Sequence, residues 1–134
     1  MGIDYGDKRI GIALSDPLNI ISSPYEVFKN MGEEQALNHI INLVKQFDVD
    51  EIAMGLPLNM DGSEGERALI HKAFGHKLES LSGIKVHFVD ERLTSAEAEE
   101  MLIASGMRRE KRKEIIDKIS AQIILQTFMN ESKK

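Results

Sequence analysis

The sequence has no cysteine and no long apolar run. Without cysteine the chain forms neither disulfides nor thiolate-ligated zinc or iron–sulfur sites, which is typical of proteins in a reducing compartment. No apolar stretch approaches the ~18 residues that span a bilayer. The start, Met1-Gly2-Ile3-Asp4, lacks the basic and apolar regions of a secretory signal. We therefore expect a cytoplasmic protein with no membrane partner.

An excess of positive charge is also missing. The chain carries 17 Lys and Arg against 22 Asp and Glu, a formal net charge of −5. This balance argues against a protein that coats nucleic acid by bulk electrostatics. The 134 residues match one domain, 1–134, because single hydrophobic cores run to ~100–200 residues. Neither a repeat nor a linker interrupts the chain.

Apolar periodicity predicts strands first and then strands alternating with helices. Asn30, with Glu33 three residues later, is the expected N-cap of the first helix. The predicted apolar side of the second helix carries Ile70, Phe74, Leu78 and Leu81. The expected strands are 1–3, 10–15, one within 19–28, 51–56 and 84–89, and the expected helices are about 33–47, 66–81, 94–106 and 114–129.

This order of elements predicts an α/β fold. Strands joined by a hairpin pair antiparallel, whereas strand–helix–strand units form right-handed parallel crossovers. We expect a five-stranded mixed sheet, with three antiparallel strands followed by parallel strands, and helices on both faces.

Four acidic residues stand where the pattern predicts strand ends or an apolar helix face. Asp4, Asp90 and Glu91 follow predicted strands, and Asp117 lies on the last helix. A carboxylate on an apolar face costs several kcal/mol unless it is paired or coordinated. A cation held between acids from separate elements would remove that cost, and such oxygen ligands suit a hard metal ion.

Ordinary structural roles also fit each acid. Asp4 fits a turn, Asp90 or Glu91 could pair with Arg92, and Asp117 could bond Arg112 or Lys113. On the last helix, Asp117 is in line with three apolar positions, while a neighbouring polar stripe is expected to face solvent. The apolar positions are Ala121, Ile124 and Phe128, and the polar stripe is Lys118, Gln122 and Gln126.

A basic segment precedes that helix. Between Arg108 and Lys113 five positive side chains stand against one negative one. Such a run fits a solvated loop or a phosphate-binding surface equally well. Basic side chains that surround a group of acidic, metal-binding residues are the arrangement that phosphodiester cleavage requires. The predicted nucleic-acid-binding residues are Lys8, Arg9, Arg67, Arg92, Arg108, Arg109, Lys111 and Arg112.

The four histidines form no recognisable metal-binding or catalytic pattern. We assign no chemistry to them and expect surface or packing roles for His39, His71, His76 and His87.

Four motifs stand in this order along the chain: Asp4-Tyr5-Gly6-x-Lys8-Arg9-Ile10-Gly11, Gly55-Leu56-Pro57-Leu58-Asn59-Met60-Asp61-Gly62-Ser63, Asp90-Glu91-Arg92-Leu93-Thr94, and Lys111-Arg112-Lys113 through Ile116-Asp117-Lys118. Together they resemble the YqgF/RuvX family over nearly the whole chain. The resemblance implies a ribonuclease H-like fold and a hydrolase that cuts a nucleic-acid backbone with Mg²⁺ or Mn²⁺. Members are described as pre-16S rRNA nucleases or as Holliday-junction-resolvase-like proteins.

By this resemblance Asp4, Glu91 and Asp117 are the catalytic, metal-holding acids, with Asp90 as a rival of Glu91 for the metal. Strand alternation places Asp90 and Glu91 on opposite faces, which leaves the choice between them open. Members of the family carry more residues before the first motif, which predicts a truncated or misassigned start.

The leading hypothesis is a metal-dependent endonuclease that processes the 5′ end of pre-16S rRNA in ribosome biogenesis. A Holliday-junction resolvase acting in DNA repair would use the same site, and it would require a symmetric dimer. Monomer and dimer both remain open. A non-catalytic RNA-binding module is the alternative of another class.

Overall fold

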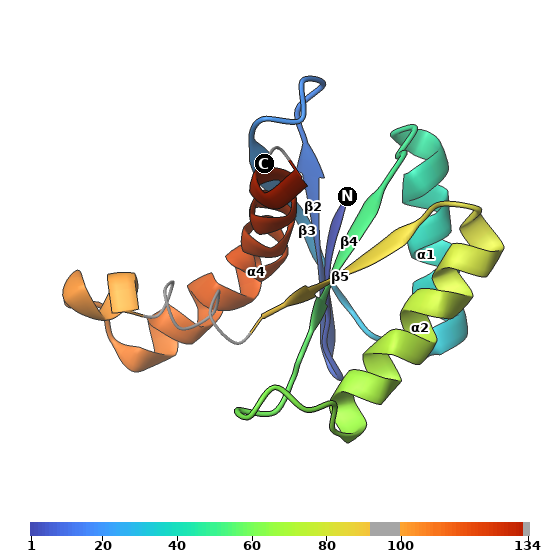
Figure 1. Cartoon of the computed structure of the whole chain (residues 1–134). Coiled ribbons are helices and arrows are strands. Elements are labelled where there is room, and N and C mark those ends of the chain that lie inside the picture. The colour runs from blue at the N-terminus through green and yellow to red at the C-terminus, as the bar shows by residue number, and fades with distance from the viewer. Residues whose placement is uncertain (92–99, 133–134) are drawn as a thin grey trace.

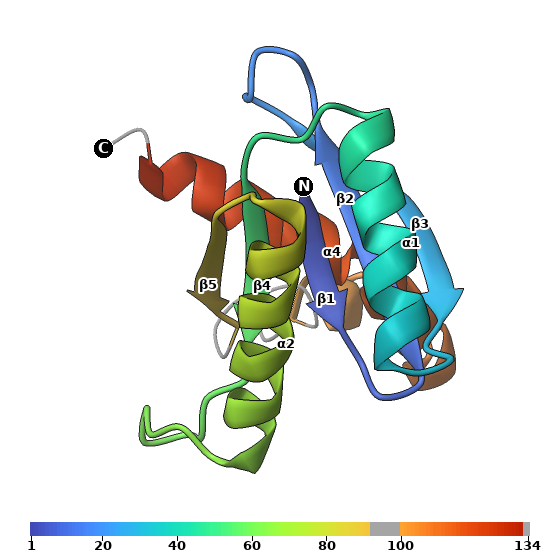
Figure 2. The ribbon, with the colours of Figure 1, turned by 90° about the vertical axis from the view of Figure 1, so that its right-hand side faces the viewer.

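A computed structural model describes residues 1–91 and 100–132, with only the backbone of Lys113 and Asp117. A five-stranded sheet lies between helices on both of its faces (Figures 1 and 2). The elements are β1 (Gly2–Tyr5), β2 (Arg9–Ser15), β3 (Ser22–Lys29), α1 (Glu33–Gln46), β4 (Ile52–Leu56), α2 (Glu66–Ser82), β5 (Val86–Asp90) and α4 (Arg109–Ser132).

The strands are ordered β3-β2-β1-β4-β5 across the sheet. β2 pairs antiparallel with both β1 and β3, whereas β4 pairs parallel with both β1 and β5. The predicted α/β class and mixed sheet are therefore confirmed. Because β1, β4 and β5 run in one direction, their carboxyl ends meet at one edge of the sheet, where α/β proteins place their sites.

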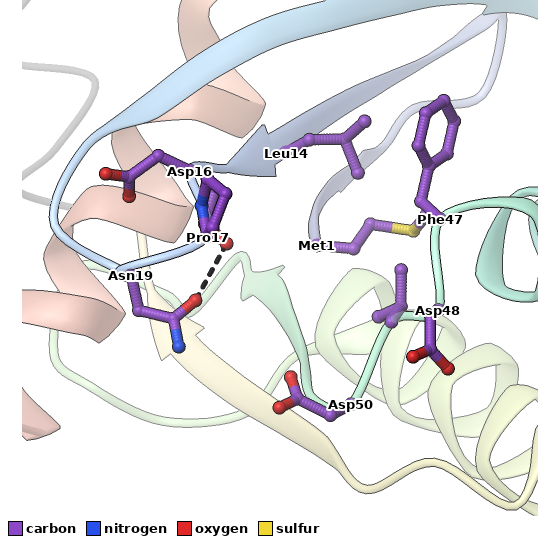
Figure 3. A pocket seen from close by; sticks show the side chains of 10 residues that line it. Met1, Leu14, Asp16, Pro17, Asn19, Phe47, Asp48 and Asp50 are labelled. Carbon is purple, nitrogen blue, oxygen red and sulfur yellow. Dashed lines mark hydrogen bonds between the residues drawn. The ribbon is translucent and has the colours of Figure 1, made fainter.

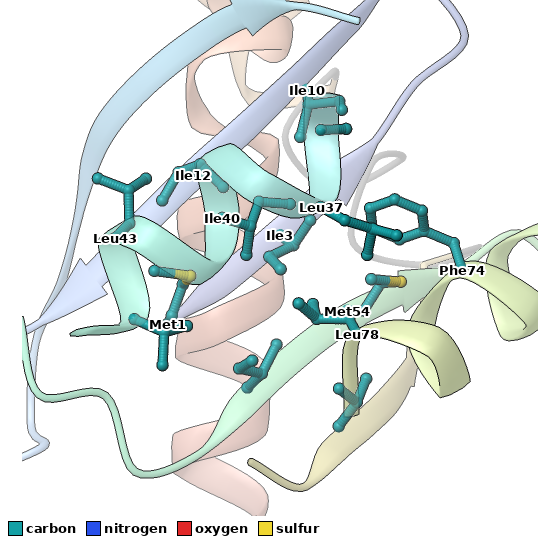
Figure 4. Packing of buried hydrophobic residues seen from close by; sticks show 14 residues of the cluster. Met1, Ile3, Ile10, Ile12, Leu37, Ile40, Leu43, Met54, Phe74 and Leu78 are labelled. Carbon is teal, nitrogen blue, oxygen red and sulfur yellow. The ribbon is translucent and has the colours of Figure 1, made fainter. Parts of the chain in front are cut away.

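One face of the sheet packs on α1 and α2. Ile3 and Met54 project from the central strands against Ile40 of α1 and Leu78 of α2 (Figure 4). All four side chains are fully buried, and Tyr5 stacks on Phe74 at the edge of this cluster. This face is a continuous apolar core.

The other face packs on α4 and uses small residues. Ala13 and Ala53 of the sheet lie against Ala121 and Ile124 of α4. A methyl group added at Gly2 would come within 2.5 Å of the Ala121 carbonyl oxygen. The helix backbone therefore approaches the centre of the sheet closely.

The apolar side predicted for α2 is partly wrong. Phe74 and Leu78 are buried as expected, but Ile70 and Leu81 are exposed. His71 instead occupies the buried stripe, three residues before Phe74 and seven before Leu78. The prediction counted only apolar residues as buried, whereas the helix also buries His71, whose ring has a hydrogen-bond partner.

The first helix begins without the predicted cap. Its N-cap is Gly32, one residue before Glu33. The Asn30 side chain instead links the two chain segments beside it, since its Nδ2 donates to the Gly6 carbonyl at 2.9 Å and its Oδ1 accepts from the Gly32 N–H at 3.1 Å. The pattern of Asn followed by Glu therefore predicts where the helix starts, but the Asn30 side chain does not cap the helix.

The last helix begins earlier than predicted. α4 starts at Arg109, not near Glu114, so the basic segment forms the first turns of the helix. The Arg112 N–H donates to the Arg108 carbonyl at 2.9 Å, which is the helical pattern. Arg, Lys and Glu are good helix formers, and a charge run alone does not predict a loop.

The polar stripe of α4 faces solvent only in part, since the Lys118 side chain is exposed as predicted. Gln122 and Gln126 instead bind the backbone at the start of β3. Gln122 Nε2 donates to the Ser22 carbonyl at 3.1 Å, and Gln126 Oε1 accepts from the Ser22 N–H at 3.0 Å. An edge strand has backbone groups without a neighbouring strand, and here glutamine side chains satisfy them.

Of the helix predicted over 94–106, residues 100–104 are helical and Gly106 follows with a φ of 78°. Residues 92–99 lie outside the described part of the chain. Within the described residues, no helix combines the length and the apolar character needed to cross a membrane.

Candidate active site

Asp4 and Glu91 lie on the α4 face at the carboxyl end of the parallel strands. Gly2 contacts α4, and strand alternation turns Asp4, two residues later in β1, to the same face. In β5, Val89 packs into the α4 cluster, and Glu91 follows it by two residues. The two acids thus come from different strands and reach one region.

Asp90 points to the other face. Val86 and Phe88 pack against the α1 and α2 side, and Asp90 continues their alternation. Asp90 is in register with Leu56 of β4, whose carbonyl lies 3.4 Å from the Glu91 N–H. The choice between the two acids, open from the sequence, now favours Glu91 as the neighbour of Asp4.

Electrostatics also couple Glu91 to Asp4. The pKa of Glu91 is raised from 4.5 to about 7, first by burial and next by the negative charge of Asp4. The Arg67 guanidinium lowers this pKa, and Asp90 raises it more weakly. The folded protein therefore holds a partly buried carboxyl group in an environment that disfavours its charged form.

Gly55 of β4 makes room for the Glu91 carboxyl group. A methyl group at Gly55 would lie 3.0 Å from Glu91 Oε2 and 2.7 Å from Ile124 Cδ1. Glu91 and Ile124 of α4 therefore both lie beside Gly55, where the strand has no side chain. This contact places the Glu91 carboxyl group between the sheet and α4.

Asp117 belongs to α4, seven residues before Ile124 and four before Ala121. Positions at these spacings share one side of a helix. The Asp117 side chain lies outside the described residues, so its meeting with Asp4 and Glu91 stays a prediction. Among the side chains that the structure does describe, no three His, Asp or Glu residues form a group that could hold a metal ion.

Among the described side chains, Arg67 is a predicted cation whose charge acts on Glu91. It stands in the first turn of α2, its side chain is 63% exposed, and its Nη1 is 3.7 Å from Asp7 Oδ2. It lowers the pKa of Glu91 although the Asp7 carboxylate partly balances its charge. An exposed cation beside buried acids is suited to attract a phosphate.

The remaining predicted cations differ in their surroundings. Lys8 and Arg9 are exposed at the turn between β1 and β2, the turn that follows Asp4. Arg112 is partly buried, and its Nη1 donates to the Met107 carbonyl at 2.7 Å. This hydrogen bond holds the Arg112 side chain at the start of α4. Arg108, Arg109 and Lys111 are exposed there, and Arg92 lies outside the described residues.

The sequence predicted only a surface or packing role for His71, and the buried ring also supports the candidate site. It is 4% exposed, and its Nδ1 donates to the Gly55 carbonyl at 3.1 Å. Burial lowers its pKa, so the ring is neutral and holds its proton for this bond. His71 therefore fixes the strand segment beneath Glu91 from the opposite face. The helical spacing of Ala68, His71 and Leu78 was the available signal.

A hollow of about 340 Å³ lies at the other end of the sheet (Figure 3). Asp16, Asp48 and Asp50 line it, together with Met1 and Phe47. Asp16 Oδ1 accepts the N–H groups of Ile20 and Ile21 at 2.7 and 3.0 Å, so this acid stabilises its own loop. None of the predicted site residues lines this hollow.

Comparison with known proteins identifies the family. A family model described as "RuvX: Holliday junction resolvase" matches residues 1–131. The chain belongs to the RuvX family. A relative from Endomicrobium trichonymphae, named "Putative pre-16S rRNA nuclease", is 49% identical over 131 residues, which cover 97% of this chain and 94% of the relative.

A second relative of this RuvX chain carries the same name. It comes from Streptococcus pyogenes serotype M5 and is 43% identical over 136 residues, which cover 98% of this chain and 97% of the relative. The predicted family is thus confirmed, and the names support a hydrolase acting on nucleic acid.

Solved structures confirm the predicted ribonuclease H-like fold. The structure "T. thermophilus RuvC in complex with Holliday junction substrate" matches with a TM-score of 0.57 and 12% identity, covering 94% of this chain and 89% of that one. At this identity the RuvC likeness shows the fold alone.

Proposed function

We propose that this chain is a metal-dependent endonuclease that cleaves structured RNA and matures the 5′ end of the 16S rRNA precursor. The proposed catalytic acids are Asp4, Glu91 and Asp117, and the proposed metal is Mg²⁺ or Mn²⁺. One observation carries the proposal: Asp4 and Glu91, from separate strands, share the α4 face and raise the energy of each other's charge. The names of the relatives support RNA as the substrate.

The residues present fit a divalent cation. Carboxylate oxygens are the ligands that Mg²⁺ and Mn²⁺ prefer. Burial and the nearby Asp4 charge both disfavour the ionised form of Glu91, and a cation beside the two groups would offset both effects. Asp117 would complete the set from α4, on the helix side that carries Ile124. Asp90, on the other face, is not part of the proposed set.

The chain's own side chains would then bind and orient the substrate. When bound, the metal ion supplies activation of water and stabilisation of the charge that develops on the phosphate. Arg67 is placed to attract that phosphate beside Glu91. Lys8 and Arg9 flank the turn after Asp4, and the exposed cations at the start of α4 extend the positive surface along a nucleic-acid backbone.

Cleavage of a precursor RNA tests the proposal. Wild type should cut a 16S precursor transcript in Mg²⁺ or Mn²⁺ and not in EDTA. Asp4→Asn should lose ~10³-fold or more, since metal-assisted charge stabilisation contributes several kcal/mol. Asp50→Asn is the matched control, because it makes the same change at the opposite end of the sheet.

Two results would contradict this assignment. Equal cleavage by wild type and Asp4→Asn would assign the activity to a contaminant. Binding of the transcript by both proteins, without cleavage by either in any divalent metal, would favour the non-catalytic RNA-binding module.

A junction resolvase is the second candidate, favoured by the description of the matching family. It would use the same acids but would require two copies of the site related by symmetry. A dimer that cuts a four-way DNA junction faster than the precursor RNA would support it. A monomer that cuts only the RNA would remove it.

A further inference from the structure

The loop from Pro57 to Gly65 carries an apolar side chain at its tip, and the proposed function leaves this side chain without a role. Met60 is 91% exposed. The loop contains no Lys or Arg, so it has no cation with which to bind a phosphate. Single exposed apolar residues are common on protein surfaces. The position and the rigidity of this one distinguish it.

Both ends of the loop lie at the proposed active site. It begins after Leu56, which is in register with Asp90 and whose carbonyl faces the Glu91 N–H. It ends at α2, where Arg67 in the first turn acts on Glu91. Both views of the ribbon show this loop projecting past the sheet at the end where β1 and β4 finish (Figures 1 and 2). A strand bound at the acids would pass beside it.

The loop is held rigid by its own hydrogen bonds. The Asn59 N–H donates to the Ser63 carbonyl at 2.9 Å, and the Gly62 N–H donates to the Asn59 carbonyl at 2.9 Å. Asp61 Oδ1 accepts both the Ser63 N–H at 2.9 Å and the Ser63 hydroxyl at 2.6 Å. Gly62 has a φ of 88°, a conformation that favours glycine. Met60 therefore projects from a fixed support, which lowers the entropy lost on binding.

The acidic side chains near Met60 are engaged within the protein. Asp61 binds Ser63, and Glu64 forms an ion pair with Lys72 of α2. The group that the loop tip presents to a ligand is thus a long, polarisable thioether. Methionine side chains contact aromatic faces favourably, and they serve as wedges between bases in other nucleic-acid-binding proteins.

We infer that Met60 is a base-binding residue, which packs against an unpaired or unstacked nucleobase of the RNA strand held at Asp4 and Glu91. The inference rests on the proposed function. It adds a substrate preference, because the enzyme would then select RNA in which a base is exposed next to the scissile phosphate. Fully paired RNA would offer Met60 no such face.

The test uses binding, so that it does not depend on turnover. RNA hairpins carrying the fluorescent base 2-aminopurine, either at a single unpaired position or within a fully paired stem, are titrated with protein in the Asp4→Asn background. Binding of the hairpin with the unpaired base should change its fluorescence. Met60→Ala should weaken this binding about tenfold and suppress the change, because stacking of one base contributes ~1–3 kcal/mol.

Three further variants sharpen the result. Met60→Leu should keep most of the binding, since it keeps an apolar side chain. Leu18→Ala removes a similarly exposed apolar residue, 74% exposed, from the loop at the opposite end of the sheet, and it should change nothing. Asn59→Ala, which removes the side-chain support of the loop, should weaken binding less than Met60→Ala.

The outcomes separate the two proposals. If wild type cleaves the precursor and Met60→Ala binds both hairpins like its parent, the base-binding role is wrong and the nuclease stands. If Met60→Ala weakens binding to both hairpins equally, Met60 does not select an unpaired base and the inference also fails. If wild type neither binds nor cleaves RNA, both proposals fail together.

Discussion

The two faces of the sheet are built for different purposes. The face toward α1 and α2 is a continuous core of large side chains such as Ile3 and Leu78. The face toward α4 is made of small residues such as Gly2 and Ala53, and it ends in the acids of the candidate site. The first face supplies most of the buried apolar surface. The second brings the backbone of α4 close to the sheet, beside the strands that carry Asp4 and Glu91.

The largest expected effect is a loss of stability on both faces, which should be accompanied by a loss of cleavage on the α4 face alone. Leu78→Ala and Ile124→Ala each remove a buried aliphatic side chain and should each cost ~2–5 kcal/mol of the free energy of unfolding. Only Ile124→Ala should also reduce cleavage below the unfolding temperature, because Ile124 flanks the Gly55 segment beside Glu91. Urea unfolding and cleavage rates measure the two quantities. Equal loss of cleavage in both variants would show that the faces are not separable.

A smaller effect should follow from filling the space beneath Glu91. Gly55→Ala places a methyl group 3.0 Å from the Glu91 carboxylate and 2.7 Å from Ile124, so one of them must shift. Such overpacking costs ~1–3 kcal/mol. Cleavage should also fall, because at 3.0 Å the Glu91 carboxyl group, a proposed metal ligand, must give way by a few tenths of an ångström. Unchanged cleavage at wild-type stability would remove Gly55 from the site.

The smallest effect should be a pH dependence without metal. The pKa of Glu91 is raised in the folded protein to about 7, so the folded state holds this proton more tightly than the unfolded state. The contribution of Glu91 to stability is therefore present below its unfolded pKa of 4.5 and is lost as the pH rises toward 7. Burial contributes most to this shift of the pKa, and the charges of Asp4, Arg67 and Asp90 contribute less.

Urea unfolding across that pH window measures the effect, with Glu91→Gln as the variant that should lose it. Saturating Mg²⁺ should restore stability at the upper end of the window. The buried, neutral His71 changes stability in the opposite direction as the pH falls, so both proteins share that background. An identical pH dependence in Glu91→Gln and wild type would contradict the assigned cause.

The sequence predicted the architecture well because β1, β2, β4 and β5 are short, mostly apolar and clearly separated, whereas the mostly exposed β3 could be placed only within 19–28. Alternation in β5 predicts Asp90 and Glu91 on opposite faces, and the contact with Gly55 and Ile124 puts Glu91 on the α4 face. The alternation did not reveal which face α4 would cover, because that depends on Gly2 and Gly55, whose small size is informative only in three dimensions. The choice of Glu91 therefore required the packing of the helix.

Other features of the site depend on contacts between distant residues. Gln122 and Gln126 resemble a solvent-exposed stripe, yet they bind the backbone of β3, about 100 positions away. His71 was predicted to have a surface or packing role, and it also binds the Gly55 carbonyl through one hydrogen bond. The local sequence pattern indicates whether a residue favours a buried or an exposed position, and tertiary packing determines which hydrogen-bond partner it has.

Mn²⁺ binding measures whether Asp4 and Glu91 hold one divalent cation on the α4 face. Loss of the electron paramagnetic resonance signal of free Mn²⁺ reports binding without any substrate. We expect Asp4→Asn and Glu91→Gln each to abolish the binding seen in wild type, while Asp90→Asn, on the other face, should keep it. Undiminished binding in Asp4→Asn and Glu91→Gln, or binding lost only in Asp90→Asn, would contradict this assignment of the metal ligands.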